Sequence, residues 1–422
     1  MYQHQLTTLK NGLKVITVPM KQVESMTLMI GVRAGSRYEN LKINGLSHFL
    51  EHMFFKGTSK RPTTLDIAKA LDGIGATFNA FTGKEFTGYF IKANAQHQSL
   101  AFDVLTDMIL NSKFDTKEID RERGVIIEEI NMYEDLPAQR IPELFEFLLY
   151  SPTPLGWYVA GKKENIENLK RNDFTAYLNR LYHPGNMVIV KSGKLENKEC
   201  LQMVEKYFGN LKGKAKEDLN SLSFNQKEPK LLLKNKKTAQ SHFCLGVRTY
   251  PYSHPDHYVL KVLATILGGS MSSRLFIQVR EKRGLAYYVR TFAESFLDNG
   301  YLMTQTGVDT NKIDEAIKVI LDNYKQIIDI KVPEKELKKA KELIKGRLVL
   351  ALEDSQNVAL DYFEQYFYEE EIHDLDQKIK LIDQVSVEDI QRVAKDIFKP
   401  QNLNLAIIGP YKEESRFLKL LK

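Results

Sequence analysis

The sequence is poor in cysteine and has no long apolar run. Its 422 residues include two cysteines, Cys200 and Cys244, which are too few for a disulfide framework and have no metal-ligand spacing. No stretch approaches the roughly 18 unbroken apolar residues that a membrane-crossing helix needs. The first residues also lack the basic start and apolar core of a secretory signal. These absences predict a cytoplasmic protein of a reducing compartment, without a membrane partner.

The chain also lacks a large excess or a local concentration of charge of one sign. The chain carries 60 Lys and Arg against 54 Asp and Glu, a net charge of +6, and these residues are spread along its whole length. A nucleic-acid-binding protein would be expected to concentrate its basic residues on one stripe, so we expect no nucleic-acid partner. With 43% hydrophobic and 27% charged residues, the composition is that of an ordinary folded protein.

Two sequence patterns occur twice in the chain. Residues 26–33 read MTLMIGVR and residues 241–248 read SHFCLGVR, an offset of 215 positions. Residues 182–190 and 398–406 each open a strand-like stretch with an aromatic-x-Pro-x-Asn turn, at an offset of 216 positions. Because two independent markers keep their spacing to within one residue across half the chain, the sequence predicts an internal duplication.

The duplication divides the chain into two domains. A polar segment with Gly and Pro, residues 210–230, lies between the copies and has the composition of a linker. We therefore predict a first domain at residues 1–209 and a homologous second domain at residues 231–422. Residues 78–93 alternate and turn back on themselves, and long helical stretches follow. This pattern predicts the α+β class, with a mostly antiparallel sheet packed against helices in each domain.

The first copy contains candidate metal ligands in the stretch GLSHFLEHMFFKGT. His48 and His52 are four positions apart, so on a helix both imidazoles project from one face. Two neutral imidazoles suit a borderline-soft divalent ion, most commonly zinc. Glu51 lies on the same side and can reach a water at the metal without being a ligand. On so apolar a helix, burying these groups without a partner would cost several kcal/mol, which favours a metal.

Two other groups of polar residues are expected to have structural roles only. We expect Ser47 or Asn44 to cap the start of the histidine-bearing helix. A second histidine pair, His254 and His257, has a proline between its members and no apolar helix around it. We therefore expect this pair to lie in a surface turn and not to bind a metal.

The third ligand must come from another segment, because catalytic zinc usually has three protein ligands and one open position. The best candidate is the acidic stretch IDRERGVIIEEINMYED, which is typical of a helix with Val125 and Ile126 toward the core. Glu122 and Glu129, seven positions apart, line the same face, whereas Glu128 points elsewhere. The spacing favours Glu129 as the ligand and Glu122 as an acid that orients a histidine or tunes the water.

The H-x-x-E-H order of residues 48–52 is the mark of the inverzincin peptidases. Together with Glu129, 77 positions after His52, it resembles the pitrilysin family, which includes insulin-degrading enzyme and the mitochondrial and bacterial processing peptidases. The resemblance runs essentially from end to end and is closest to the short bacterial members with two homologous domains. It implies a zinc endopeptidase with one Zn²⁺ per chain, held by His48, His52 and Glu129, and Glu51 as general base.

The resemblance also assigns substrate contacts. In the second copy, residues 268–289 look like the family's substrate-clamping segment, in which Arg280 and Tyr287 contact the substrate or stabilise the oxyanion. The second copy lacks H-x-x-E-H, so only the first domain is expected to be catalytic. The residues that look like the edge strand to which a substrate peptide adds are Asn79, Ala80, Phe81 and Thr82.

The resemblance further implies an assembly. Long family members enclose a chamber between two two-domain halves, and this chain supplies one half. A dimer is therefore expected, in which Arg280 and Tyr287 of one subunit act on the metal site of the other. A homodimer would be self-sufficient, and a heterodimer with a related subunit is the alternative. The chamber implies unfolded peptides or precursor segments as substrates. The competing interpretation is a non-catalytic peptide-binding or scaffold subunit, and manganese or cobalt could occupy the same ligands.

Overall fold

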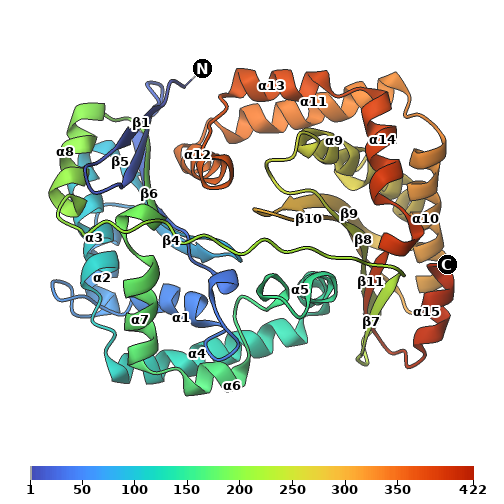
Figure 1. Ribbon diagram of the computed structural model, residues 1–422, viewed down its shortest axis with the longest axis horizontal. Helices are drawn as coiled ribbons and strands as arrows, with labels where there is room; N and C mark the ends of the chain where they lie inside the picture. Colours follow the sequence, from blue (N-terminus) through green and yellow to red (C-terminus); the bar gives the residue numbers. More distant parts are fainter. Residues whose placement is uncertain (1) are drawn as a thin grey trace. The chain divides into compact units, whose positions relative to one another are not determined.

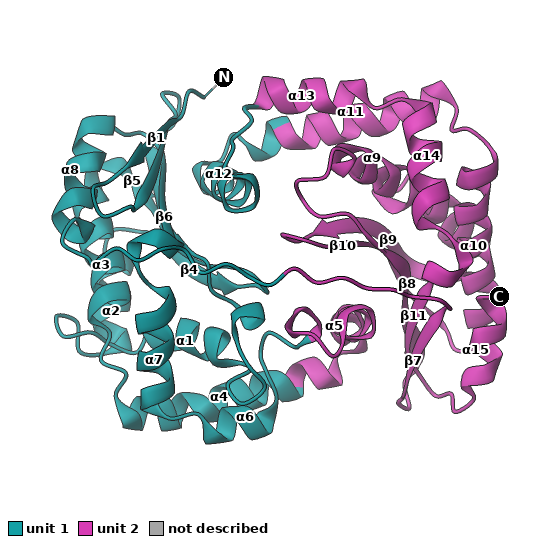
Figure 2. Cartoon of the chain, viewed as in Figure 1, with its two compact units in different colours: residues 1–131, 157–220, 349–374 teal, residues 132–156, 221–348, 375–422 magenta. Residues whose placement is uncertain are grey.

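The computed structural model describes residues 2–422 and divides them into two compact units, coloured separately in Figure 2. Unit 1 comprises the residues up to 131 together with 157–220 and 349–374. Unit 2 comprises residues 132–156, 221–348 and 375–422. Residues 212–227, within the predicted linker, form neither helix nor strand. Each unit is built on one β-sheet, but neither is a contiguous half of the sequence.

Unit 1 contains a six-stranded sheet in the order β1-β2-β6-β3-β5-β4. Its central strands β3 (Ser25–Val32) and β6 (Met187–Gly193) are almost wholly buried, as expected of strands covered on both faces. All neighbours are antiparallel except the parallel pair β2 and β6. The remaining strands are β1 (Gln5–Thr8), β2 (Lys14–Pro19), β4 (Thr77–Thr82) and β5 (Thr87–Asn94).

Unit 2 contains a five-stranded sheet in the order β7-β11-β8-β10-β9. Its pairing repeats that of β2-β6-β3-β5-β4 strand for strand, including the single parallel pair, here β7 with β11. The repeated topology confirms the prediction of two homologous α+β domains with mostly antiparallel sheets. The strands are β7 (Lys230–Asn235), β8 (Gln240–Thr249), β9 (Ala286–Ser295), β10 (Gly300–Asp309) and β11 (Asn404–Gly409).

One helix of each sequence copy packs on the sheet of the other copy. Helix α5 (Pro137–Tyr150) belongs to the first copy by sequence, yet it packs on β7, β8 and β11 of unit 2. Helix α12 (Ser355–Glu369) belongs to the second copy, yet it packs on β2, β3 and β6 of unit 1. At its start, the Ser355 hydroxyl lies 2.9 Å from that of Thr27 on β3. Figure 2 shows each helix in the colour of its adopted unit. The packing units are therefore discontinuous in sequence, because each contains one helix from the other predicted copy.

The other face of each sheet is covered by helices whose apolar sides form one continuous core with it (Figure 1). Amphipathic spacing explains this burial; in α14 (Val387–Ile397), for example, Ile390, Val393, Ala394 and Ile397 are all buried. None of the helices in the described residues is both long and apolar enough to traverse a bilayer. Besides α12, the helices of unit 1 are α1 (Leu46–Phe54), α2 (Thr64–Asp72), α3 (Gln98–Asn111), most of α4 (Thr116–Asp135), α6 (Lys163–Asn168), α7 (Arg171–Leu181) and α8 (Asn197–Phe208). Besides α5, those of unit 2 are α9 (His257–Gly268), α10 (Ile313–Asp329), most of α11 (Glu334–Ala351), α13 (Leu375–Gln384), α14 (Val387–Ile397) and α15 (Glu414–Leu420).

The histidine pair of the second copy does not lie entirely in a surface turn. His254 precedes α9, but His257 is its first residue and is only 8% exposed, so the prediction is wrong for His257. The apolar helix α9 starts immediately after the turn, so its first residue, His257, is buried together with the helix. The His257 ring packs against that of Tyr252, with centroids 4.4 Å apart.

The helix exchange leads to a prediction about folding. Residues 1–220 expressed alone would lack α12, which covers one face of the first sheet, and residues 221–422 would lack α5. We expect each fragment alone to aggregate or to melt without cooperativity, and the two together to form a folded complex. Size-exclusion chromatography and thermal melts of single and co-expressed fragments would check this. A fragment 1–220 that melts cooperatively near the temperature of the full chain would contradict it.

Candidate metal centre

Helix α1 is buried on every side except the one that carries its polar residues. His48, Glu51 and His52, at spacings of three and four, are all half-buried and lie on the remaining side. The helix therefore presents two imidazoles and a carboxylate together. The apolar side chains that fix α1 in the core are each at most 1% exposed and comprise Leu46, Phe49, Leu50, Met53 and Phe54.

The N-terminus of α1 is held by Glu39, which lies outside the helix. Its Oε1 accepts hydrogen bonds from the backbone N–H and the hydroxyl of Ser47, at 2.6 and 2.7 Å. Its Oε2 accepts from the backbone N–H of Gly45 and the side-chain amide of Asn44, both at 2.9 Å. The prediction that Ser47 or Asn44 caps the helix is wrong, because both donate to Glu39 instead. Burial raises the pKa of Glu39, and these hydrogen bonds oppose the rise.

Helix α4 brings Glu129 against the two histidines. Glu129 Oε2 lies 3.7 Å from His48 Nε2 and 3.6 Å from His52 Nε2. Candidate ligand atoms of the three residues all lie within 4.8 Å of one another. Ile126 anchors α4 in the core, but Val125 is 50% exposed, so its predicted burial is wrong. Only a narrow face of α4 is buried. Val125 is one residue before Ile126, which is a rotation of about 100° around the helix axis, so Val125 lies outside that face.

Glu122 orients His52. Its Oε1 accepts a hydrogen bond from His52 Nδ1 at 2.9 Å, and its Oε2 lies 2.5 Å from the ammonium of Lys56. A carboxylate acceptor keeps the imidazole proton on Nδ1, which leaves the Nε2 lone pair free to bind a metal. Burial alone would raise the pKa of Glu122, but the hydrogen bonds from His52 and Lys56 lower it below its ordinary value. Sequence reasoning missed Lys56, although it follows His52 by only four positions, just beyond the end of α1.

The protonation of His48 suits a metal ligand. Burial, reinforced by the neighbouring His52, lowers the pKa of His48 to about 3, so the ring is neutral at physiological pH. The two rings meet edge to face with centroids 4.7 Å apart. Metal ligation requires neutral imidazole, and two imidazoles with one carboxylate are a common catalytic zinc set. The residues present therefore fit a divalent ion such as zinc.

Glu51 contacts the edge strand instead of joining the ligand cluster. Its Oε2 accepts a hydrogen bond from the Thr82 hydroxyl at 2.5 Å. Burial raises the pKa of Glu51, while Thr82 and His52 act against the rise. A carboxylate with a raised pKa beside a metal site is suited to exchange a proton with water. The structure thus brings together the predicted base and the predicted substrate strand.

The four residues assigned to the edge strand, Asn79, Ala80, Phe81 and Thr82, all lie in β4. In the described part of the chain β4 pairs only with β5, so its other side is unpaired. Asn79 is exposed, whereas Ala80 packs into the core of unit 1. A free strand edge of this kind can accept an extended peptide as an additional strand.

Arg280 and Tyr287 lie in unit 2 and contact each other. Arg280 belongs to a π-helical segment, Phe276–Glu281, a feature often found at functional sites. Its guanidinium carbon lies 4.7 Å from the ring centroid of Phe276 and 5.0 Å from that of Tyr287. Tyr287, on β9, is 78% exposed, and the Arg280 side chain is 36% exposed. The two side chains therefore form an accessible cation–π pair.

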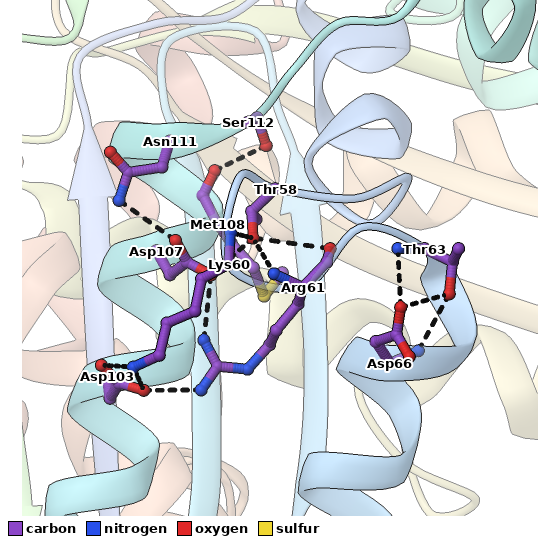
Figure 3. A network of polar contacts seen from close by, with 10 residues as sticks. All are labelled: Thr58, Lys60, Arg61, Thr63, Asp66, Asp103, Asp107, Met108, Asn111 and Ser112. Atoms are coloured by element: carbon purple, nitrogen blue, oxygen red, sulfur yellow. Dashed lines mark hydrogen bonds and ion pairs between the residues drawn. The ribbon is translucent and has the colours of Figure 1, made fainter.

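The loop that follows α1 is tied to helix α3 by buried polar contacts, shown in Figure 3. Arg61 donates to Asp107 at 2.9 Å and to Asp103 at 2.5 Å. The Thr58 hydroxyl also donates to Asp107, at 2.5 Å. Because Glu39 holds one end of α1 and this network holds the chain beyond the other, the histidines are fixed from both directions.

The Glu122 contact leads to a test of metal binding. We expect Glu122→Gln to weaken zinc affinity about 10- to 100-fold, because loss of an orienting carboxylate typically costs that much. Competition with a chromophoric chelator would measure the affinity. The matched control is Asp120→Asn on the same helix, where the side chain is 68% exposed. Equal zinc affinity in the two variants would contradict the assigned role of Glu122.

Two family descriptions match this chain in tandem. Residues 14–161 match "Insulinase (Peptidase family M16)" and residues 168–344 match "Peptidase M16 inactive domain". A protein of Bacillus subtilis strain 168 named uncharacterized zinc protease YmxG is 35% identical over 403 residues, which cover 96% of this chain and 97% of that protein.

Solved structures share the fold over almost the whole chain. A protease from Helicobacter pylori superposes with a TM-score of 0.91 at 24% identity, covering 97% of this chain and 100% of that one. A chain of Complex III2 from Candida albicans gives a TM-score of 0.85 at 18% identity, covering 99% of each. With a relative 35% identical along its full length and both family descriptions matched in order, the chain belongs to peptidase family M16, the insulinase family.

Proposed function

We propose that this chain is a zinc-dependent endopeptidase that cleaves unfolded peptides or extended precursor segments, with one zinc ion per chain. The observation that carries the proposal is the convergence of His48, His52 and Glu129, with Glu51 one helical turn from His48. The names of relatives such as the Bacillus subtilis zinc protease support the same chemistry.

The residues divide the reaction between them. A zinc ion held by His48, His52 and Glu129 would supply a Lewis acid that polarises the scissile carbonyl and lowers the pKa of water toward ~7. Glu51 takes a proton from the attacking water and returns it to the leaving amine. The unpaired edge of β4 holds the substrate backbone as an extended strand. Such pairing requires a peptide without its own secondary structure, which accounts for the proposed substrate class.

The role of Glu51 can be tested by removing its charge. We expect Glu51→Gln to keep its zinc and to lose turnover of a quenched-peptide library about 10²- to 10⁴-fold, the usual contribution of a general base. Glu128→Gln is the matched control, because Glu128 is exposed on α4 next to Glu129 and, among the residues that the structure describes, accepts a hydrogen bond only from Asn131. Metal analysis and cleavage assays with and without chelator measure both quantities. Appreciable turnover by Glu51→Gln would refute the assignment.

We propose further that the enzyme is a dimer in which Arg280 and Tyr287 of one subunit act on the zinc site of the other. Support comes from their accessibility and their mutual contact, and from the chamber of the long family members. An arginine and a tyrosine can donate charge-assisted hydrogen bonds to a developing oxyanion or to the peptide carbonyl. Because this chain carries both parts, a homodimer is self-sufficient.

Mixing two inactive variants tests action between subunits. Arg280→Ala retains an intact Glu51, and Glu51→Gln retains an intact Arg280. We expect the mixture to recover part of the wild-type peptidase activity through mixed dimers, while neither variant alone does. Subunit exchange is checked by co-purification of differently tagged chains. No recovery in a preparation that exchanges subunits would show that Arg280 acts within its own chain or not at all.

A second candidate is a non-catalytic peptide-binding or scaffold subunit of a heterodimer. Two observations favour it: residues 168–344 match a domain described as inactive, and the fold also occurs in a chain of Complex III2. The assembled cluster of His48, His52 and Glu129 argues for the enzyme instead. Metal analysis separates the two, because a scaffold has no need of zinc.

A further inference from the structure

We propose that Thr82 is a positioning residue for Glu51, and that it couples peptide binding along β4 to the orientation of the Glu51 carboxylate. The inference rests on the peptidase function proposed above and adds a residue to it. Its basis is a single contact: the hydroxyl of Thr82, the last residue of β4, donates a hydrogen bond to the proposed base.

The contact is the main restraint on Glu51. At 2.5 Å, the hydrogen bond between Thr82 Oγ1 and Glu51 Oε2 has the length of a strong charge-assisted bond. Glu51 forms no other hydrogen bond or ion pair with the described residues. The hydroxyl therefore selects which way the carboxylate plane turns, and it leaves Oε1 without a protein partner. Without the hydroxyl, no hydrogen bond or ion pair with the described residues would fix this angle.

Thr82 itself is held firmly by the hairpin that follows it. It pairs with Thr87 at the start of β5. The connecting turn is clamped by the backbone N–H of Arg37, which donates to the Lys84 carbonyl at 2.8 Å. The Arg37 side chain also forms a buried ion pair with Glu85, with side-chain exposures of 3% and 1%. A buried pair with such partners is costly to disrupt, so the hydroxyl is presented from a rigid support.

The geometry of β4 separates substrate binding from base positioning. Side chains alternate along a strand, so Phe78, Ala80 and Thr82 share the face toward the core and α1. The backbone groups of the unpaired edge point sideways, in the plane of the sheet. A peptide that pairs with this edge restrains the β4 backbone, and Thr82 transmits the restraint to Glu51. When a substrate does not pair along β4, the Glu51 carboxylate is then less well ordered.

Three variants test the proposal. Thr82→Val keeps the side-chain shape and removes the donor, whereas Thr82→Ser keeps the donor. Thr8→Val makes the same chemical change at an exposed residue of β1, the opposite edge strand of the same sheet. For Thr82→Val we expect kcat to fall about 10- to 100-fold, the effect of a misplaced catalytic group, with KM, zinc content and melting temperature unchanged. Thr82→Ser should retain most of the activity, and Thr8→Val should match the wild type. Crystal structures of zinc-loaded wild type and Thr82→Val should show the Glu51 carboxylate rotated in the variant.

Each contrary result has a distinct meaning. Unchanged kcat in Thr82→Val, or an equal loss in Thr82→Ser, overturns the proposal because the hydroxyl would then not matter. Loss of zinc or a lowered melting temperature in Thr82→Val overturns it in favour of a structural role. Failure of the peptidase proposal shows itself separately, as a wild-type protein without chelator-sensitive cleavage. In that case the crystal structures still decide, and an unrotated Glu51 carboxylate in Thr82→Val rejects the positioning role.

Discussion

The candidate centre depends on the burial of helix α1. Five apolar side chains remove this helix from solvent on every side but one, and that side carries His48, Glu51 and His52. Polar groups in such a place need partners, because an unsatisfied buried group costs free energy of the order of a few kcal/mol. The surrounding elements supply them: Glu122 bonds His52, Thr82 bonds Glu51, and Glu129 faces both histidines.

Side chains outside the helix hold the chain at both ends of α1. Glu39 accepts hydrogen bonds from buried backbone N–H groups at the helix start that have no partner within the helix, and a negative charge there also interacts well with the helix dipole. Beyond the helix end, Arg61 and Thr58 fasten the chain to Asp107 on α3. A metal site requires its ligands to be held within a few tenths of an ångström. Rigid attachment at both ends provides this without any contribution from the ion itself.

The two copies share a fold but differ in the side chains that they carry near the edge strand. Both copies form the same sheet, with one parallel pair at the same place, and the equivalent helices α5 and α12 are exchanged. Only the first copy carries two histidines and a glutamate on one face of the helix next to its edge strand. The helix next to β9 is α9, and its one histidine is the buried His257. In the second copy, the accessible pair of Arg280 and Tyr287 stands near the start of the corresponding edge strand, β9. The edge strands β4 and β9 of the two sheets therefore lie beside different functional side chains.

The sequence alone determined the local geometry. Spacings of three and four placed His48, Glu51 and His52 on one helix face, and a spacing of seven aligned Glu122 with Glu129, because helix periodicity is set by the backbone. The repeated markers likewise predicted two homologous α+β domains. The sequence could not reveal that Glu39 caps α1, that Thr82 reaches Glu51 across 31 positions, or that α5 and α12 change partners. These contacts depend on how whole elements pack, and only the tertiary structure decides which distant side chains meet.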